Sequence, residues 1–289
     1  MEKTTIRLGG VPEHFNLPIH LAIENGAFEN RGLRVDWTTF EGGTGQMTKA
    51  LREGSIDACV LLTEGIIKDI VKGNPSKIIS EYVKTPLTWG IHTSAKNPLD
   101  TYQAIFDKQY AISRFGSGSH LMAIVDANSK GHFISKEQFS VIGNLEGALK
   151  ALDEQEVDIF YWEKYTTKPY VDSGQLKRVG EFLTPWPCFV IAATDHILDK
   201  ESVAMIRMLR TIHDSCDLFM EANNAVQLVS SRYDLLLEDA ERWYHNTAWA
   251  IDGWVSNKMI KSVLYNLKTA GIIEQEVPIP DLIWKRERR

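Results

Sequence analysis

The feature that most constrains the fold lies in residues 6–82, where short apolar strands alternate with helices and a glycine-bearing or polar turn follows each of the first three strands. These turns span residues 9–16, 41–46 and 62–64. In an open α/β sheet the strands deliver their carboxyl ends to one edge, so such turns gather there beside the free N–H groups of helix N-termini. The pattern predicts that a small ligand, often an anionic one, binds at that edge.

The alternation of strands and helices repeats once and then changes. The first run of alternating strands and helices ends at residue 83 and predicts a sheet with right-handed crossovers. Residues 89–182 follow the same order. In this second run we expect one helix after Asp100 and another at residues 163–171. We therefore predict an α/β fold of two αβ domains with mixed, mostly parallel sheets. A helical C-terminal region should cover an existing sheet, with helices at residues 202–220, 225–231, 235–244 and 256–270.

Composition excludes several classes of protein. The 289 residues carry a net charge of -6, which opposes a nucleic-acid-binding surface, and no segment approaches the roughly 20 apolar residues of a membrane span. The N-terminus has no apolar signal core, so we expect a cytoplasmic protein, or a periplasmic one only if a leader was trimmed. The cysteines form no CxxC pair and the histidines no HxH or HExxH pattern, so we expect no metal site and no cofactor.

Several segments together resemble a known group of proteins. These segments resemble periplasmic-binding-protein-like class II domains, and they occur along the chain in the same order as in that family. Within that group they resemble the ABC-transporter substrate-binding proteins for aliphatic sulfonates, nitrate and taurine, and the thiamin-pyrimidine (NMT1/THI5-like) proteins. The segments that carry the resemblance are residues 6–10, 24–33, 41–45, 54–57, 114–120 and 154–163.

The resemblance implies a particular domain organisation. A discontinuous first domain would comprise residues 1–86 and 190–289, with a second domain, residues 87–189, inserted between them. Two hinge crossings would lie near residues 84–87 and 189–192, and the ligand would bind in an interdomain cleft that closes by hinge motion. An ABC permease would be a partner if the protein is exported.

One candidate turn, formed by Ser117, Gly118, Ser119 and His120, follows a strand and opens a predicted helix. Its backbone N–H groups and hydroxyls suit a sulfonate, a carboxylate or a phosphate. An ordinary N-cap with a glycine turn has the same sequence pattern. The glycine spacing is not the GxGxxG of a dinucleotide-binding turn, and the resemblance favours a role in ligand binding.

The first domain offers candidates in two further turns. Gly43 and Thr44 let the backbone approach a ligand closely, or simply permit a turn with positive φ. Thr63 and Glu64 follow a buried strand. Thr63 could cap the next helix, and Glu64 could accept a hydrogen bond from a ligand amine or only enrich the first helical turn in negative charge.

Histidines and tryptophans complete the set of candidates. Asn16 is expected as the N-cap of the first helix, and His14, like His120, suits ligand hydrogen bonding or acid/base chemistry. Flat aromatic walls at strand ends suit a ring or an alkyl ligand, although core packing gives the same pattern. The residues with this pattern are Trp89, Trp162 with Glu163, and Trp186, whereas Trp243, Trp249 and Trp254 are expected to pack among the late helices.

Two functions remain open on the sequence. The leading one is a solute-binding protein that holds an organic, possibly anionic ligand without bond chemistry. The alternative is a cytosolic enzyme on the same fold, of the thiamin-pyrimidine or menaquinone-pathway type. For the menaquinone-pathway type, His14 or His120 is the candidate base. Residues 58–65, beside the third strand, contain no lysine or histidine, which argues against the thiamin-pyrimidine chemistry.

Overall fold

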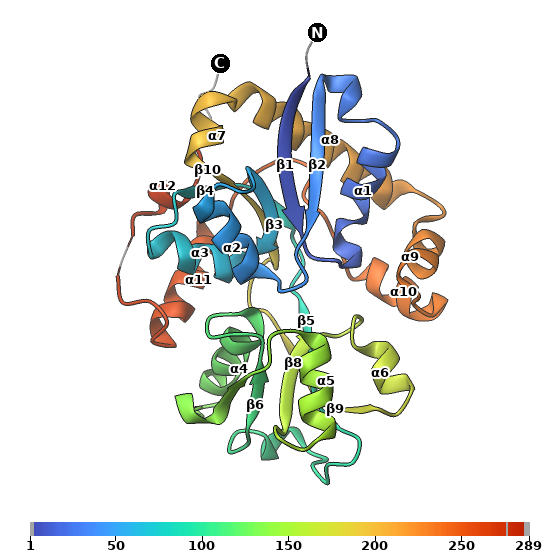
Figure 1. Ribbon diagram of the computed structural model, residues 1–289, viewed down its shortest axis with the longest axis vertical. Helices are drawn as coiled ribbons and strands as arrows, with labels where there is room; N and C mark the ends of the chain where they lie inside the picture. Colours follow the sequence, from blue (N-terminus) through green and yellow to red (C-terminus); the bar gives the residue numbers. More distant parts are fainter. Residues whose placement is uncertain (1–2, 276, 286–289) are drawn as a thin grey trace. The chain divides into compact units, whose positions relative to one another are not determined.

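The computed structural model describes residues 3–275 and 277–285. The chain divides into two compact units, each with one five-stranded sheet (Figure 1). Residues 1–2 and 286–289, which belong to the expected first domain, lie outside the described residues, as does residue 276. Unit 1 comprises Met1–Thr85, Trp186–Tyr265 and Ile273–Arg289, and unit 2 comprises Pro86–Pro185 and Asn266–Ile272.

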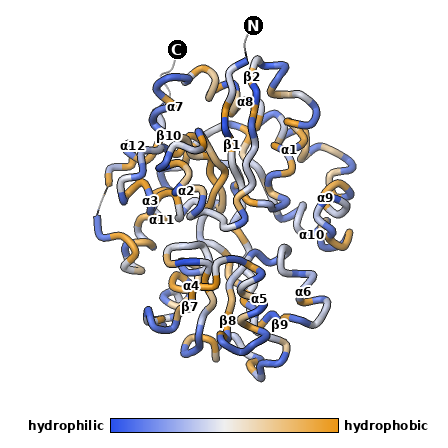
Figure 2. The backbone as a smooth tube through the Cα atoms, in the orientation of Figure 1, coloured by the Kyte–Doolittle hydropathy of each residue, from blue (hydrophilic) through white to orange (hydrophobic). Residues whose placement is uncertain are grey.

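The sheet of unit 1 is mixed. β1 (Thr4–Gly10) runs parallel to β2 (Leu33–Thr39) and to β3 (Ala58–Leu62). β10 (Phe189–Thr194) lies antiparallel between β3 and β4 (Ser76–Val83), so four strands run in one direction and one opposes them. Every residue of β3 and β10 is buried, in keeping with the hydrophobic colouring of this part of the sheet in Figure 2.

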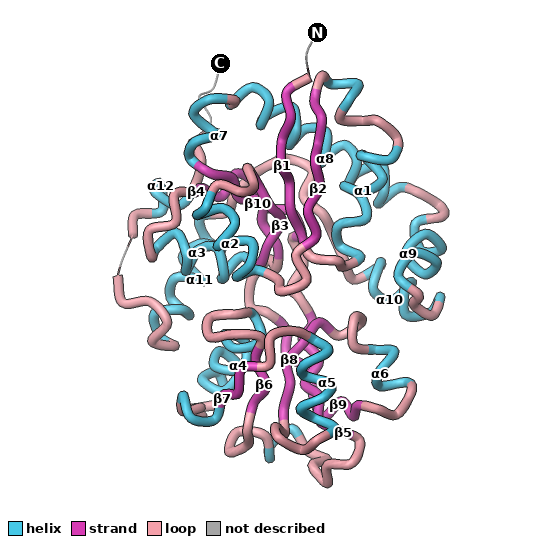
Figure 3. Tube along the Cα trace, viewed as in Figure 1, coloured by secondary structure: helices cyan, strands magenta, loops and turns pink. Residues whose placement is uncertain are grey.

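The helices of unit 1 form two groups, one that alternates with the strands and one that follows β10 (Figure 3). The helices α2 and α3 pack on β3 and β10, whereas α8 packs on α1 and β2. The first group is η1 (His14–Asn16), α1 (Leu17–Glu24), η2 (Glu29–Arg31), α2 (Thr44–Glu53) and α3 (Thr63–Val71). The second group is α7 (Asp195–Lys200), α8 (Ser202–Glu221), α9 (Ala225–Tyr233), α10 (Leu237–His245), α11 (Asn257–Thr269) and α12 (Ile279–Leu282).

Unit 2 repeats the arrangement of strand directions of unit 1, but its antiparallel strand comes first in the chain instead of last. β6 (Tyr110–Ile112) runs parallel to β7 (Phe139–Val141) and to β8 (Ile159–Glu163). β5 (Thr88–Ser94) lies antiparallel between β8 and β9 (Leu176–Leu183). The helices of this unit are η3 (Tyr102–Ala104), α4 (Gly118–Ser129), η4 (Lys136–Gln138), α5 (Leu145–Asp153) and α6 (Lys168–Asp172).

This architecture confirms the predicted fold class: two αβ units with mixed sheets and a helical C-terminal region. The four late helices predicted from the sequence correspond to α8, α9, α10 and α11. In the part of the chain that the structure describes, no helix is both long enough and apolar enough to cross a membrane.

Two local predictions in unit 2 differ from the structure. The helix expected after Asp100 is only the short turn η3, and the carbonyl of Ile105 accepts a hydrogen bond from the Tyr110 hydroxyl. The helix expected at residues 163–171 is reduced to α6, because the Glu163 carboxylate binds the N–H groups that follow it and holds that segment in a turn.

The segment 189–192 also has a different place from the one expected. It belongs to β10, inside the sheet of unit 1, rather than to a crossing between domains. A continuous apolar run is stabilised by pairing on both sides and by complete burial, which a linking segment does not provide. The chain passes from unit 2 back to unit 1 at Pro185–Trp186.

Candidate ligand-binding edges

In unit 1 the carboxyl ends of the parallel strands meet at one edge of the sheet. Gly9 on β1 lies opposite Cys59 on β3, and Phe189 at the start of β10 lies opposite Leu62 at the end of β3. The turns after β1, β2 and β3 therefore share this edge with the residues that precede β10. We call it the unit 1 edge, and it holds the predicted site residues His14, Asn16, Gly43, Thr44, Thr63, Glu64 and Trp186.

Glu64 is a fully buried carboxyl at this edge. Its Oε2 accepts a hydrogen bond from Nε1 of Trp186 at 2.8 Å, whereas its Oε1 has no partner among the described residues. Burial raises the pKa of Glu64 to about 7, and the hydrogen bond from Trp186 opposes that rise. Oε1 can therefore accept a hydrogen bond from a ligand, and the protonated carboxyl can donate one.

Two threonines fix the backbone around Glu64. The Thr44 hydroxyl oxygen accepts the N–H of Leu62 at 3.3 Å, and the Thr63 hydroxyl donates to the carbonyl of Pro187 at 2.7 Å. Thr63 therefore does not cap α3, as the sequence suggested, but holds the loop that leads into β10. Gly43 precedes α2 with φ of 67°, a left-handed conformation that favours glycine.

Asn16 is fully buried beside β1. Its Nδ2 donates to the carbonyl of Val11 at 2.8 Å, and its Oδ1 has no partner among the described residues. Asn16 occupies the N-cap position of α1, as predicted, but its side chain forms no capping hydrogen bond. The physical reason is the backbone of Asn16, which has φ of -87° and ψ of 0° rather than the extended conformation of a capping residue.

His14 lies in a buried aromatic cluster. Ring centroids lie 4.3 Å away in Trp243, 5.1 Å away in Phe15 and 5.7 Å away in Tyr233. Its Nε2 has no hydrogen-bond partner in the described chain. Burial lowers the pKa of His14 to about 3, so the imidazole is neutral near pH 7. Trp243, which the sequence assigned to packing alone, thus packs directly on a predicted site residue.

Unit 2 has a corresponding edge. Trp89 at the start of β5 lies opposite Glu163 at the end of β8, and β6 runs parallel to β8, so the turn after β6 lies at the same edge as these two residues. We call it the unit 2 edge. It holds the predicted site residues Trp89, Ser117, Gly118, Ser119, His120, Trp162 and Glu163.

The serine hydroxyls of this edge are engaged by the loop itself. The Ser117 hydroxyl oxygen accepts the N–H of His120 at 3.4 Å, the Ser119 hydroxyl oxygen accepts the N–H of Ser113 at 3.2 Å, and the two hydroxyls lie 3.0 Å apart. The N–H groups of Gly118 and Ser119, in the first turn of α4, have no acceptor among the described residues. Two backbone donors therefore remain for a ligand.

His120 is half-buried and supports the same loop. Its Nδ1 accepts the N–H of Gly116 at 3.0 Å, and its ring packs on Phe139 with 4.7 Å between the centroids. The ring thus holds the turn that precedes α4.

The remaining predicted residues of the unit 2 edge have structural partners. Trp89 is buried, and its Nε1 donates to the Thr184 hydroxyl at 3.1 Å. Trp162 is half-buried and stacks on Phe160, with 5.1 Å between the centroids, in a cluster that includes residues of α5. The Oε2 of Glu163 accepts three hydrogen bonds from the following turn, so this carboxylate stabilises the turn.

Sequence reasoning missed a buried carboxyl in unit 2. Asp126 on α4 is fully buried and accepts hydrogen bonds from the hydroxyls of Tyr102 at 2.5 Å and Tyr161 at 2.7 Å. Burial raises its pKa. A single acidic residue in an otherwise apolar stretch of helix was the available signal. Among the described residues, no group of three or more His, Cys, Asp or Glu side chains could hold a metal ion.

Comparisons with known proteins agree with this architecture. The sequence model of the Ca3427-like PBP family matches residues 89–182. The solved structure of the CA3427 gene product from Candida albicans, described as having the generic periplasmic binding protein fold, matches with a TM-score of 0.90 at 25% identity, over 99% of this chain and 97% of that chain. No curated protein sequence matches the chain.

Sulfonate-binding proteins match at lower identity. The alkanesulfonate-binding protein SsuA from Xanthomonas axonopodis pv. citri, bound to MOPS, gives a TM-score of 0.81 at 16% identity, over 98% of this chain and 99% of that chain. The aliphatic sulphonate binding protein SsuA from Escherichia coli gives 0.73 at 14% identity, over 99% and 93%. The chain therefore has a periplasmic-binding-protein-like class II fold, as the sequence resemblance implied.

Proposed function

We propose that this chain is a solute-binding protein whose sheet edges, each taken by itself, bind groups of a small ligand without bond chemistry. The observation that carries the proposal is the pair of buried acceptors at the unit 1 edge, Oδ1 of Asn16 and Oε1 of Glu64, which have no partner among the described residues. A buried polar atom without a partner costs about 1–3 kcal/mol, and native proteins leave few of them. An N–H or O–H group of a ligand would remove this cost.

We further propose which ligand group each edge accepts, with each edge taken by itself. The unit 1 edge would bind a hydrogen-bond donor of a small organic molecule. The unit 2 edge would bind an anionic group, which would accept from the backbone N–H groups of Gly118 and Ser119, where the helix dipole of α4 also favours negative charge. The sulfonates named for the two SsuA proteins support this ligand class.

Several finer expectations stay predictions. They are the interdomain cleft with hinge closure, membership of the NMT1/THI5-like group, the cellular compartment, and an ABC permease as partner. The enzyme alternative gains no support from the histidines. His14 has a pKa of about 3, which makes it a weak base, and Nδ1 of His120 already accepts a backbone hydrogen bond.

Taurine tests the proposal because it combines an ammonium group with a sulfonate. Ethylamine and ethanesulfonate each carry one of the two groups, so they test the unit 1 edge and the unit 2 edge separately. At a ligand concentration of about 100 Kd, binding should raise the free energy of unfolding by about 2.7 kcal/mol, which calorimetry and thermal unfolding would both detect. NMR spectra of taurine incubated with the protein should remain unchanged, since no reaction occurs.

Matched variants separate the ligand groups. Glu64→Gln should weaken the binding of taurine and of ethylamine while leaving that of ethanesulfonate unchanged. Glu146→Gln is the control, because Glu146 is exposed and holds the same second position in α5 that Glu64 holds in α3. If none of the three probes binds, the proposed ligand class is wrong. If taurine is consumed, the binding function is wrong and the enzyme alternative is favoured.

A further inference from the structure

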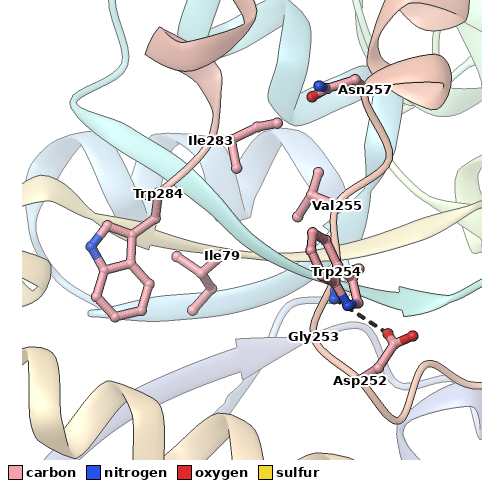
Figure 4. Close-up of a pocket in the computed structure, with 8 residues that line it drawn as sticks. All are labelled: Ile79, Asp252, Gly253, Trp254, Val255, Asn257, Ile283 and Trp284. Carbon is pink, nitrogen blue, oxygen red and sulfur yellow. Dashed lines mark hydrogen bonds between the residues drawn. The ribbon is translucent and has the colours of Figure 1, made fainter. Parts of the chain in front are cut away.

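A pocket of about 450 Å³ lies in unit 1 on the side of β4 that pairs with no other strand of the sheet, and no residue of the unit 1 edge lines it (Figure 4). Two segments cover this side of β4. The carbonyl of Trp254 accepts the N–H of Glu81 at 3.0 Å, and the N–H of Trp284 donates to the carbonyl of Ile78 at 2.9 Å. Ile79 lies between these two contacts on β4, so the pocket occupies the gap between the two covering segments. Its lining is Ile79, Asp252, Gly253, Trp254, Val255, Asn257, Ile283 and Trp284.

The two tryptophans give the pocket aromatic walls. Figure 4 shows the indoles of Trp254 and Trp284 on either side of Ile79. Trp254 is 67% exposed, which leaves a large apolar ring in water. The backbone of each tryptophan is hydrogen-bonded to β4, so the points from which the two side chains extend are set by the sheet.

Negative charge lies beside these rings. The Asp252 carboxylate accepts the N–H of Trp254 at 3.3 Å and forms no ion pair with a described residue. The Glu81 carboxylate accepts the N–H of Ser256 at 2.8 Å. Burial raises the pKa of Glu81, the hydrogen bond from Ser256 and the charge of Lys84 oppose the rise, and the charge of Asp252 adds to it. Both carboxylates thus accept a backbone hydrogen bond from the covering segment that contains Trp254.

We propose that this pocket binds a small organic cation with an apolar body, with the charge near Asp252 and the body against Trp254 and Trp284. Indole faces attract cations through the quadrupole of the ring, and tryptophan does so best among the aromatic side chains. The volume lies within the range of small-molecule sites, which combine apolar walls with a few polar groups that orient the ligand. This site is independent of the proposed sulfonate-type site, since the two share no residue.

Three probes of one shape test the charge preference: 3-phenylpropylammonium, 3-phenylpropanol and 3-phenylpropionate. The titrations would follow the indole N–H signals of Trp254 and Trp284 by NMR, assigned with single Trp→Phe variants. We expect the cation to bind at least fivefold more tightly than the alcohol and the carboxylate to bind most weakly. Asp252→Asn should weaken cation binding three- to tenfold and leave alcohol binding unchanged, because asparagine keeps the acceptor for Trp254.

Trp254→Ala should weaken the binding of cation and alcohol alike, at least fivefold, and its ring is exposed enough for the variant to keep its melting temperature. Phe133→Ala is the control, because it removes an aromatic ring that is 81% exposed in unit 2 and should leave all affinities unchanged. The site is refuted if Trp254→Ala binds as tightly as the wild type or if the two indole signals do not shift. The cation preference is refuted if the alcohol binds as tightly as the ammonium compound.

Discussion

Replacement of Glu64 by glutamine tests the environment of the most deeply buried carboxyl at the unit 1 edge. Burial raises the pKa of Glu64 from 4.5 to about 7. The difference, 7 minus 4.5, corresponds to about 3 kcal/mol at about 1.36 kcal/mol per pKa unit. The folded chain keeps this proton to a higher pH than the unfolded chain. The stabilising contribution is therefore fully present below pH 4.5 and is lost as the pH rises to about 7.

Urea unfolding between pH 5 and pH 8 measures this effect as a difference between the wild type and Glu64→Gln. Glutamine retains an oxygen for the hydrogen bond from Trp186 and carries no charge at any pH. We expect the free energy of unfolding of the variant to rise relative to the wild type by about 2–3 kcal/mol across this range, with most of the change below pH 7. His14 and His92, whose pKa values burial lowers to about 3, act in both chains and cancel in the difference.

Glu146→Gln serves as the matched control, since the side chain of Glu146 is exposed at the equivalent position of α5. Its free energy of unfolding should stay within about 0.5 kcal/mol of the wild type at every pH, as is usual for surface substitutions. Parallel pH curves for the wild type and Glu64→Gln would refute the reasoning. They would mean that the ionised Glu64 is solvated in the folded chain.

Three further predictions concern the support of the two edges. Ser117→Ala removes the N-cap of α4 and should lower the free energy of unfolding by about 1 kcal/mol, measured with urea; an unchanged value would mean that the cap contributes nothing. Gly65→Ala places a Cβ 2.3 Å from the Thr44 methyl group and should lower the free energy of unfolding by about 1–3 kcal/mol. Thr44→Ser in the same chain removes that methyl group and should largely restore the free energy of unfolding; additive effects of the two substitutions would refute the clash. Tyr161→Phe removes a hydrogen bond to the buried Asp126 and should cost about 1–3 kcal/mol, and a neutral result would require another donor to that carboxyl.

The fold could be predicted from the sequence because its signals are local. Apolar runs such as the one in β3, the glycines that end helices, and the change to a purely helical pattern after β10 each depend on a few neighbouring residues. The position of β10 was harder to predict, because residues 189–192 gain their strand partners from β3 and β4, far earlier in the chain. The residues of a single segment do not indicate which distant strands it pairs with.

The hydrogen bonds and the burial of the side chains at the two edges were less predictable than which residues lie there. The partner of Glu64 is Trp186, 122 residues away, so neither the burial of the carboxyl nor its unpaired oxygen could be inferred from the turn itself. Likewise, the hydroxyls of Ser117 and Ser119 were expected to face a ligand, but local hydrogen bonds engage them. The neighbouring N–H groups have no acceptor among the residues that the structure describes. Side-chain competition within a turn decides such outcomes.

The two edges therefore differ in chemistry although the two sheets share one arrangement of strand directions. At the start of α3 the N–H of Thr63 already binds the carbonyl of Cys188, and the buried carboxyl of Glu64 follows it, so an anion would meet an engaged donor and, above pH 7, a negative charge. At the start of α4 no carboxylate is present in the first turn, and the N–H groups of Gly118 and Ser119 have no acceptor within the described part of the chain. The rule that helix N-termini at a sheet edge favour anions thus applies to α4 and fails at α3, because the residue at the second helical position is glutamate in one case and serine in the other.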